Sequence, residues 1–200
     1  MPERNSLDEG LTNAAWGYLF LNLDINLGSV SILPRFVGWL LFLSAIQELK
    51  EDRRDLALLR PLGILLAVWS ALDWGASWLG GDIDGLLPPL DLLTAAAQMY
   101  FHFQFLTDLA ALAGQYCPLA DLSRRILRRR AAQTLLVTGI ALIPYLPARW
   151  SGTPVLNGIL LVLAAAYCLL GLSLMLCLFT LRDRLRDRPP ESGPGGAQGT

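Results

Sequence analysis

The polar residues best placed to do chemistry lie in one apolar segment, residues 89–113. Four of them fall within about 80° of one another on a helical wheel, namely Asp91, Thr94, Gln98 and His102. Carboxyl, amide and imidazole groups on one helix face can carry a proton, bind an ion or hydrogen-bond to a neighbouring helix. The stripe therefore predicts either a ligand or ion path or polar contacts between helices.

A second set of charged residues is expected near one end of the molecule. It consists of the acids Asp73 and Asp91 and the counter-charges Arg35 and Arg149. A charge in an apolar segment costs a few kcal/mol unless it is paired or solvated. We expect either acid–arginine pairs that fix helix packing or a polar vestibule that binds a small solute or cation.

Several kinds of chemistry have no residues to support them. His102 is the single histidine, and Cys117, Cys168 and Cys177 have no CxxC spacing. HExxH, GxxxxGK[ST] and GxSxG motifs do not occur. We therefore expect no metal site, no cofactor and no enzymatic activity.

The composition indicates a membrane protein with several spans. Hydrophobic residues make up 54% of the chain and charged residues 16%, and the mean hydropathy is +0.44. Between residues 131 and 181, Arg149 is the only charged residue, and prolines and glycine interrupt the run near it. Two stretches remain, each able to supply the roughly 20 apolar residues that cross a bilayer. This stretch predicts a transmembrane helical hairpin.

The whole chain extends this pattern to an all-α polytopic bundle of about six transmembrane helices, arranged as three αα-hairpins. The predicted spans are residues 11–27, 33–49, 61–79, 89–113, 131–148 and 154–181. Residues 1–10 form a predicted cytoplasmic tail. Residues 182–200, rich in proline and glycine after the last arginines, form a predicted disordered cytoplasmic tail.

The distribution of basic residues supports this topology. If the N-terminus is cytoplasmic, all but Arg35 and Arg149 of the 16 Lys and Arg residues fall on the inner side. The loop at residues 80–85 is acidic and contains no basic residue. We expect a multi-pass protein of the bacterial plasma (inner) membrane with both termini in the cytoplasm.

One inner loop is strongly basic. Its arginines are Arg124, Arg125, Arg128, Arg129 and Arg130. Leu119, Leu122 and Ile126 form an apolar face among them, so the segment is predicted to lie in the lipid headgroup layer. Each arginine near the surface attracts anionic lipid by ~1 kcal/mol. A nucleic-acid partner is not expected between two spans.

Small residues and prolines predict details of packing. Gly17 and Gly38 lie in the first two predicted spans, where glycine allows two helices to approach closely. Pro34, Pro89 and Pro154 stand where the second, fourth and sixth spans begin. Proline is tolerated in the first helical turn because its missing N–H would be unpaired there.

Two neighbouring stretches carry a family resemblance. Residues 24–28 read Asp-Ile-Asn-Leu-Gly, and residues 33–39 read Leu-Pro-Arg-Phe-Val-Gly-Trp. They resemble small bacterial multi-spanning membrane proteins of unknown function, in which a helix ends in Ile-Asn-Ile/Leu-Gly and the next begins Leu-Pro-Asp-Phe-Ile-Gly-Tyr. Arg35 replaces the acid of that pattern. The resemblance implies a bacterial plasma-membrane protein and brings no activity with it.

Two functions are compatible with these features. The first is a non-enzymatic accessory, sensing or scaffold component whose basic cytoplasmic face meets anionic lipid, a membrane protein partner or a second copy of the chain. The alternative is a small-solute or ion transporter that uses the outer acids and the stripe of Thr94, Gln98 and His102. A continuous wet path would favour transport, and a dry bundle would favour the first function.

Overall fold

The computed structural model describes residues 2–22, 26–27, 30–31, 34–51, 53–78, 88–116, 121–143 and 153–187. It is built from helices, which confirms the predicted all-α class. The helices are α1 (Pro2–Asn22), α2 (Arg35–Leu49), α3 (Arg54–Leu58), α4 (Arg60–Trp78), α5 (Pro88–Tyr116), α6 (Leu122–Leu142) and α7 (Pro154–Arg186). Two short strands, β1 (Asn26–Leu27) and β2 (Val30–Ser31), pair antiparallel between α1 and α2.

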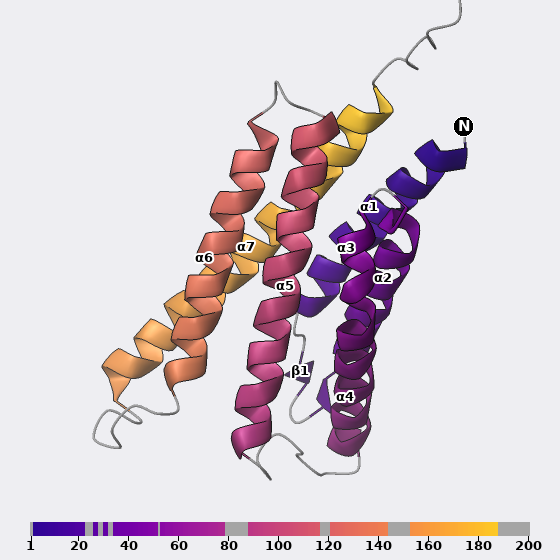
Figure 1. Ribbon diagram of the computed structural model, residues 1–200. Coiled ribbons are helices and arrows are strands. Elements are labelled where there is room, and N and C mark those ends of the chain that lie inside the picture. The colour runs from indigo at the N-terminus through magenta and orange to yellow at the C-terminus, as the bar shows by residue number, and fades with distance from the viewer. Residues whose placement is uncertain are drawn as a thin grey trace, which may run out of the picture.

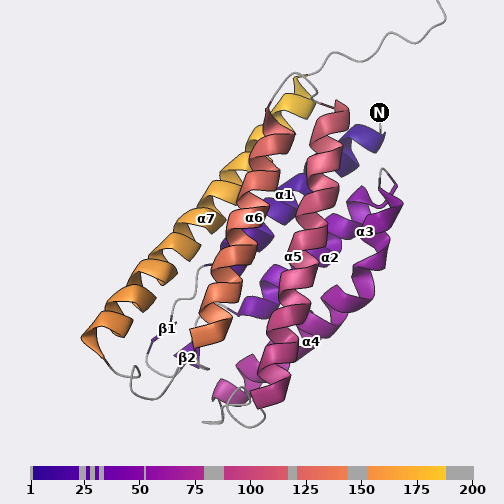
Figure 2. The ribbon, with the colours of Figure 1, turned by 60° about the vertical axis from the view of Figure 1, so that its left-hand side comes forward.

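The long helices run up and down beside one another (Figure 1). α1 packs against α2 and α7, α2 packs against α4, and α6 packs against α5 and α7, while α4 and α5 touch less extensively. Figure 2 shows the same neighbours from another side. The beginnings of α1 and α6 and the end of α7 lie at one end of the bundle (Figure 1). We call this the basic end, because the arginines in the first part of α6 and in the last part of α7 lie there.

The first helix differs from its predicted bounds at both ends. It begins at Pro2, so the residues predicted as a tail are largely helical. Leu7 and Leu11, one turn apart, are both buried, so burial of apolar side chains extends the helix toward the N-terminus. It ends at Asn22, short of the predicted residue 27, because Asn26 and Leu27 form strand β1. Asn, Asp and Gly in this stretch favour a turn over a helix.

The basic segment before the fifth predicted span is part of a longer helix. α6 begins at Leu122 and continues without a break through Arg130. Leu122 is 5% exposed and Ile126 is fully buried in the core. The prediction that this apolar face lies in the headgroup layer is therefore wrong for these two residues, because neighbouring helices of the protein cover them.

The predicted proline positions coincide with helix starts. α2 follows Pro34, α5 begins at Pro88, directly before Pro89, and α7 begins at Pro154. At α7 the side chain of Thr153 also caps the helix, since its Oγ1 accepts a hydrogen bond from the Leu156 N–H at 3.3 Å.

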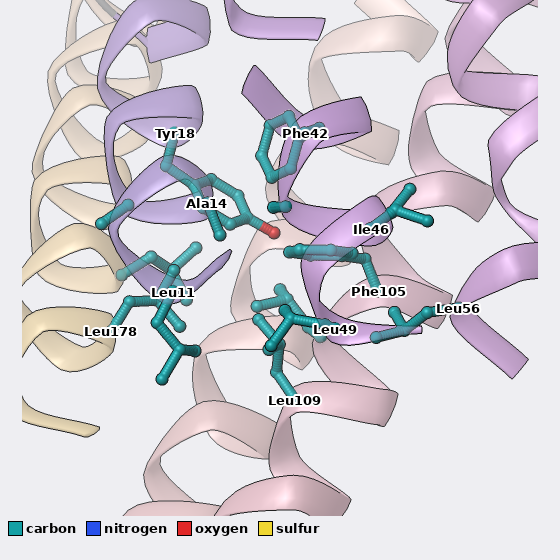
Figure 3. Close-up of a cluster of buried hydrophobic side chains, with 14 of the residues drawn as sticks. Leu11, Ala14, Tyr18, Phe42, Ile46, Leu49, Leu56, Phe105, Leu109 and Leu178 are labelled. Atoms are coloured by element: carbon teal, nitrogen blue, oxygen red, sulfur yellow. The ribbon is translucent and has the colours of Figure 1, made fainter. Parts of the chain in front are cut away.

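The core is an aromatic and leucine cluster where α1, α2 and α5 meet. Tyr18, Phe42, Phe101 and Phe105 are fully buried, and Trp39 is 2% exposed. The Phe42 ring meets those of Tyr18, Phe101 and Phe105 edge to face, with centroids 5.0, 5.6 and 5.1 Å apart. Figure 3 shows Tyr18, Phe42 and Phe105 converging from three helices. Such ring pairs add about 0.5–1.5 kcal/mol each beyond the area that they bury.

Gly17 and Gly38 face each other where α1 and α2 cross. A Cβ on Gly38 would lie 2.9 Å from Leu21 Cγ and 3.2 Å from the carbonyl oxygen of Gly17. A Cβ on Gly17 would lie 3.1 Å from the Phe42 ring and 3.2 Å from the carbonyl oxygen of Gly38. The close helix approach predicted from these two glycines is confirmed.

The outer surface of the bundle carries many exposed apolar side chains. Every long helix contributes at least one, from Trp16 of α1 and Leu40 of α2 to Leu161 and Leu169 of α7. Among the described helices, only α7 is long and apolar enough to cross a membrane, and 11% of its apolar window is buried. α2 has only 15 residues, and the other long helices include more polar residues. Six crossings stay a prediction.

We expect Gly38→Ala to lower the thermal unfolding midpoint of the protein in detergent. The added methyl group would crowd both the Leu21 side chain at 2.9 Å and the Gly17 carbonyl oxygen at 3.2 Å, and such overpacking costs about 1–3 kcal/mol. Gly139→Ala on α6 is the matched control, because a Cβ there meets nothing within 4 Å and alanine favours the helix by ~1 kcal/mol. An equal effect of the two substitutions would contradict the tight α1–α2 crossing.

Candidate functional site

A small cavity with both polar and apolar lining lies among α5, α6 and α7. Its volume is about 40 Å³. Its lining is Gln98, Met99, His102, Phe103 and Leu106 from α5, Arg130, Gln133, Thr134 and Val137 from α6, and Tyr167 from α7. A cavity volume of about 10–15 Å³ is enough to hold one water. The cavity can therefore hold a few waters or one small solute.

His102 links this cavity to the aromatic core. Its imidazole centroid lies 5.4 Å from that of Tyr18, 5.5 Å from that of Trp39 and 5.6 Å from that of Phe42. The side chain is 9% exposed. One side of the imidazole is thus covered by rings from α1 and α2, while the residue also lines the cavity toward α6 and α7.

Three buried polar atoms of the lining make no hydrogen bond to any described residue. They are Nδ1 of His102, Nε of Arg130 and Oε1 of Gln133. Gln133 is 4% exposed, so bulk water does not reach it freely. A buried polar atom without a partner costs about 1–3 kcal/mol. A bound molecule that pairs with these atoms would remove this cost.

Arg130 is held in place by residues of α5. Its Nη1 donates a hydrogen bond to Thr107 Oγ1 at 2.6 Å, and its guanidinium carbon lies 4.1 Å from the centroid of the Phe103 ring. Within the described part of the chain, no carboxylate forms an ion pair with it. Its guanidinium therefore contacts a hydroxyl and a ring, and no described acid neutralises its charge.

The other arginines of the basic segment are arranged differently. Arg124, Arg125 and Arg128 are exposed, and Arg129 is half-buried. Arg124 lies 3.8 Å from Asp121 at the surface. Arg130 differs from the other predicted lipid-contact residues because its side chain contacts Thr107 and Phe103 of α5. Lipid contact by the other four arginines stays a prediction.

The structure brings together some of the sequence-predicted site residues and separates others. Gln98 and His102 share the cavity. Thr94 is half-buried and does not line it, and neither do Asp73 on α4 or Arg35, which is exposed at the start of α2. The side chain of Asp91 and all of Arg149 and Asp24 lie outside the described residues. The vestibule formed by the outer acids is therefore not tested.

Other helices contribute partners that the sequence alone does not reveal. Gln133 and Tyr167 reach the cavity from α6 and α7, and nothing in their own segments marks them as near His102. Asp108 was also not predicted; it is 5% exposed and accepts hydrogen bonds from Gln104 Nε2 at 3.3 Å on both oxygens. Asp108 could have been identified from the sequence, because an acid inside a predicted span is expected to face the bundle interior.

Metal ligation has no visible basis in the described residues, where no three His, Cys, Asp or Glu side chains are grouped to hold an ion. Cys168 and Cys177 are free thiols, and Cys168 Sγ lies 3.6 Å from the carbonyl oxygen of Asn22. No family model, curated protein or solved structure matches this chain. The family resemblance of residues 24–39 therefore stays a prediction.

We expect Thr107→Val to lower the unfolding midpoint, since it removes the acceptor of the short bond from Arg130. A hydrogen bond to a charged group contributes about 1.5–3 kcal/mol. Thr180→Val is the control, because the exposed Thr180 hydroxyl bonds only to the carbonyl of Leu176 in its own helix. Thermal unfolding of both variants in detergent checks this. Equal midpoints would mean that Thr107 does not anchor Arg130.

Proposed function

We propose that this chain is a non-enzymatic, integral component of a bacterial plasma membrane, with six crossings and both termini in the cytoplasm. Its role would be that of an accessory, sensing or scaffold protein. The predicted spans overlap α1, α2, α4, α5, α6 and α7, and among the described helices α7 alone meets the length and hydropathy expected of a single span.

The exposed apolar surface carries the proposal. Large apolar side chains that are 40–75% exposed occur on every long helix, and on α7 they recur from Val155 to Leu176. Water-soluble monomers rarely expose apolar surface on this scale. Meanwhile Asn22, His102, Asp108 and Gln133 are buried inside the bundle. Polar residues inside and apolar residues outside are typical of a protein surrounded by lipid.

The end-to-end distribution of charge supports the orientation. The arginines that open α6 and those that finish α7 belong to the basic end, as do Arg54 and Arg60 at the starts of α3 and α4. Arg35 begins α2 at the opposite end. Basic residues collect on the cytoplasmic side of bacterial inner-membrane proteins. We therefore assign the basic end to the cytoplasm, where its exposed arginines would contact anionic lipid or a partner.

A small-solute or ion transporter is the second candidate, and the cavity beside Gln98 and His102 favours it. Two observations weigh against it. The lining comes from α5, α6 and α7 and includes neither Asp73 nor Thr94. In addition, the fully buried rings of Tyr18, Phe42 and Phe105 fill the space among α1, α2 and α5. We therefore prefer the non-transporting component.

Single-cysteine labelling in cells tests both the topology and the choice of function. In a variant whose three native cysteines are replaced by alanine, a cysteine at Ser123 should react only after a permeant reagent is supplied. A cysteine at Asp84 should react with an impermeant reagent added outside. Reversed labelling, or labelling of both sites from one side, would contradict the proposed topology.

A third cysteine, at Gln98, separates the two functions. A packed, non-transporting bundle predicts that it does not react with a small aqueous thiol reagent from both sides. Ala132, exposed on α6, provides the control for a site that faces lipid rather than the cavity. Rapid reaction at Gln98 from both sides, with none at Ala132, would reveal a continuous water-filled path and favour transport.

A further inference from the structure

We propose that the cavity among α5, α6 and α7 binds one small monovalent anion beside Arg130. The inference concerns the folded bundle itself, so it does not depend on the role proposed above. It rests on three features of the lining: an unbalanced positive charge, polar atoms without partners, and a volume suited to a small ion.

The charge of the cavity is positive. Arg130 is the only formally charged residue of the lining, which contains no Asp or Glu. Asp108, the buried acid of α5, does not line the cavity, and its carboxylate accepts a hydrogen bond from Gln104. Arg130 is half-buried and its Nε atom is buried, so its charge is partly removed from water without a counter-charge, and a bound anion would offset that cost.

The polar groups of the lining can hold such an ion. The Nε–H of Arg130 makes no hydrogen bond to a described residue and is available as a charge-assisted donor. The amide of Gln98 and the hydroxyl of Tyr167 add further donors to the same lining. The anion would thus be bound by one cationic donor and by neutral donors from the two other helices.

Of the other two unpaired atoms, Nδ1 of His102 and Oε1 of Gln133, the second fits an anion that carries water with it. Oε1 of Gln133 is an acceptor, so it requires a donor rather than a negative charge. A water beside the anion can donate to this oxygen and to the ion at once. A volume of about 40 Å³ accommodates a few particles the size of water. It excludes a large organic anion such as gluconate.

The test is the thermal unfolding midpoint of the purified full-length protein in a neutral detergent. The midpoint is measured in sodium chloride, sodium bromide, sodium acetate and sodium gluconate at one ionic strength. Because a ligand that binds only the folded state stabilises it, chloride, bromide or acetate should raise the midpoint above its value in gluconate. The increase should grow with the logarithm of anion concentration once the site begins to fill.

The four salts also separate the sources of the anion. A larger increase with the halides than with acetate would assign the site to an inorganic anion. A larger increase with acetate would assign it to the carboxylate of a small organic acid. Identical midpoints in all four salts would overturn the proposal.

Two charge-matched variants locate the effect. Arg130→Gln should abolish the difference between small anions and gluconate, whereas Arg128→Gln, which removes an exposed arginine of the same helix, should retain it. The same difference in both variants would mean a surface effect and would overturn the proposal. If Arg130→Gln does not fold, Gln133→Leu replaces it. That variant should need at least ~10-fold more anion for the same increase, and an unchanged response would overturn the proposal.

Discussion

The contact between His102 and three aromatic rings is the constraint on which the rest of the structure depends. Its imidazole lies 5.4–5.6 Å from the rings of Tyr18, Trp39 and Phe42, and this fixes α5 against both α1 and α2. Few backbone atoms of α5 approach those helices closely, because large rings fill the space between them. Because these rings fix one face of α5, another face of the same helix packs on α6. Residues of α5 also line the cavity with α6 and α7.

From that arrangement follows a division of polar groups between the inside and the ends of the bundle. Arg130 is half-buried, donates a hydrogen bond to Thr107 and lies over Phe103, so α5 holds a partly buried cation of α6. At the basic end, Arg182 of α7 lies 3.7 Å from Asp8 of α1 and joins the first and last helices at the surface. The exterior between the two ends is largely apolar. The same pattern would be unfavourable in water and is favourable in lipid, since lipid offers no partner to a polar side chain.

Sequence reasoning reached the features that depend on local pattern. Long apolar segments predicted the helices, Pro154 predicted a helix start, and the pair Gly17 and Gly38 predicted a close helix crossing. It failed where the outcome depends on tertiary contacts. Burial of Leu122 and Ile126 by other helices could not be distinguished from burial in lipid headgroups, since an amphipathic pattern is the same in both. Likewise, a helical wheel placed Gln98 and His102 on one face, but Gln133 and Tyr167 join them only through helix packing.

The central claim is that lipid surrounds the apolar exterior of the bundle, and spin-label accessibility on α7 tests it most directly. Single labels are placed at Leu161 and Leu169, which are 73% and 67% exposed, and at Asp183, whose side chain is 59% exposed beyond the predicted span. In reconstituted bilayers, the account predicts that oxygen, which concentrates in lipid, relaxes the two leucine-site labels more than a water-soluble nickel complex does. The label at Asp183 should show the reverse order. Strong relaxation of all three labels by the nickel complex would mean that water covers α7, and would contradict the account.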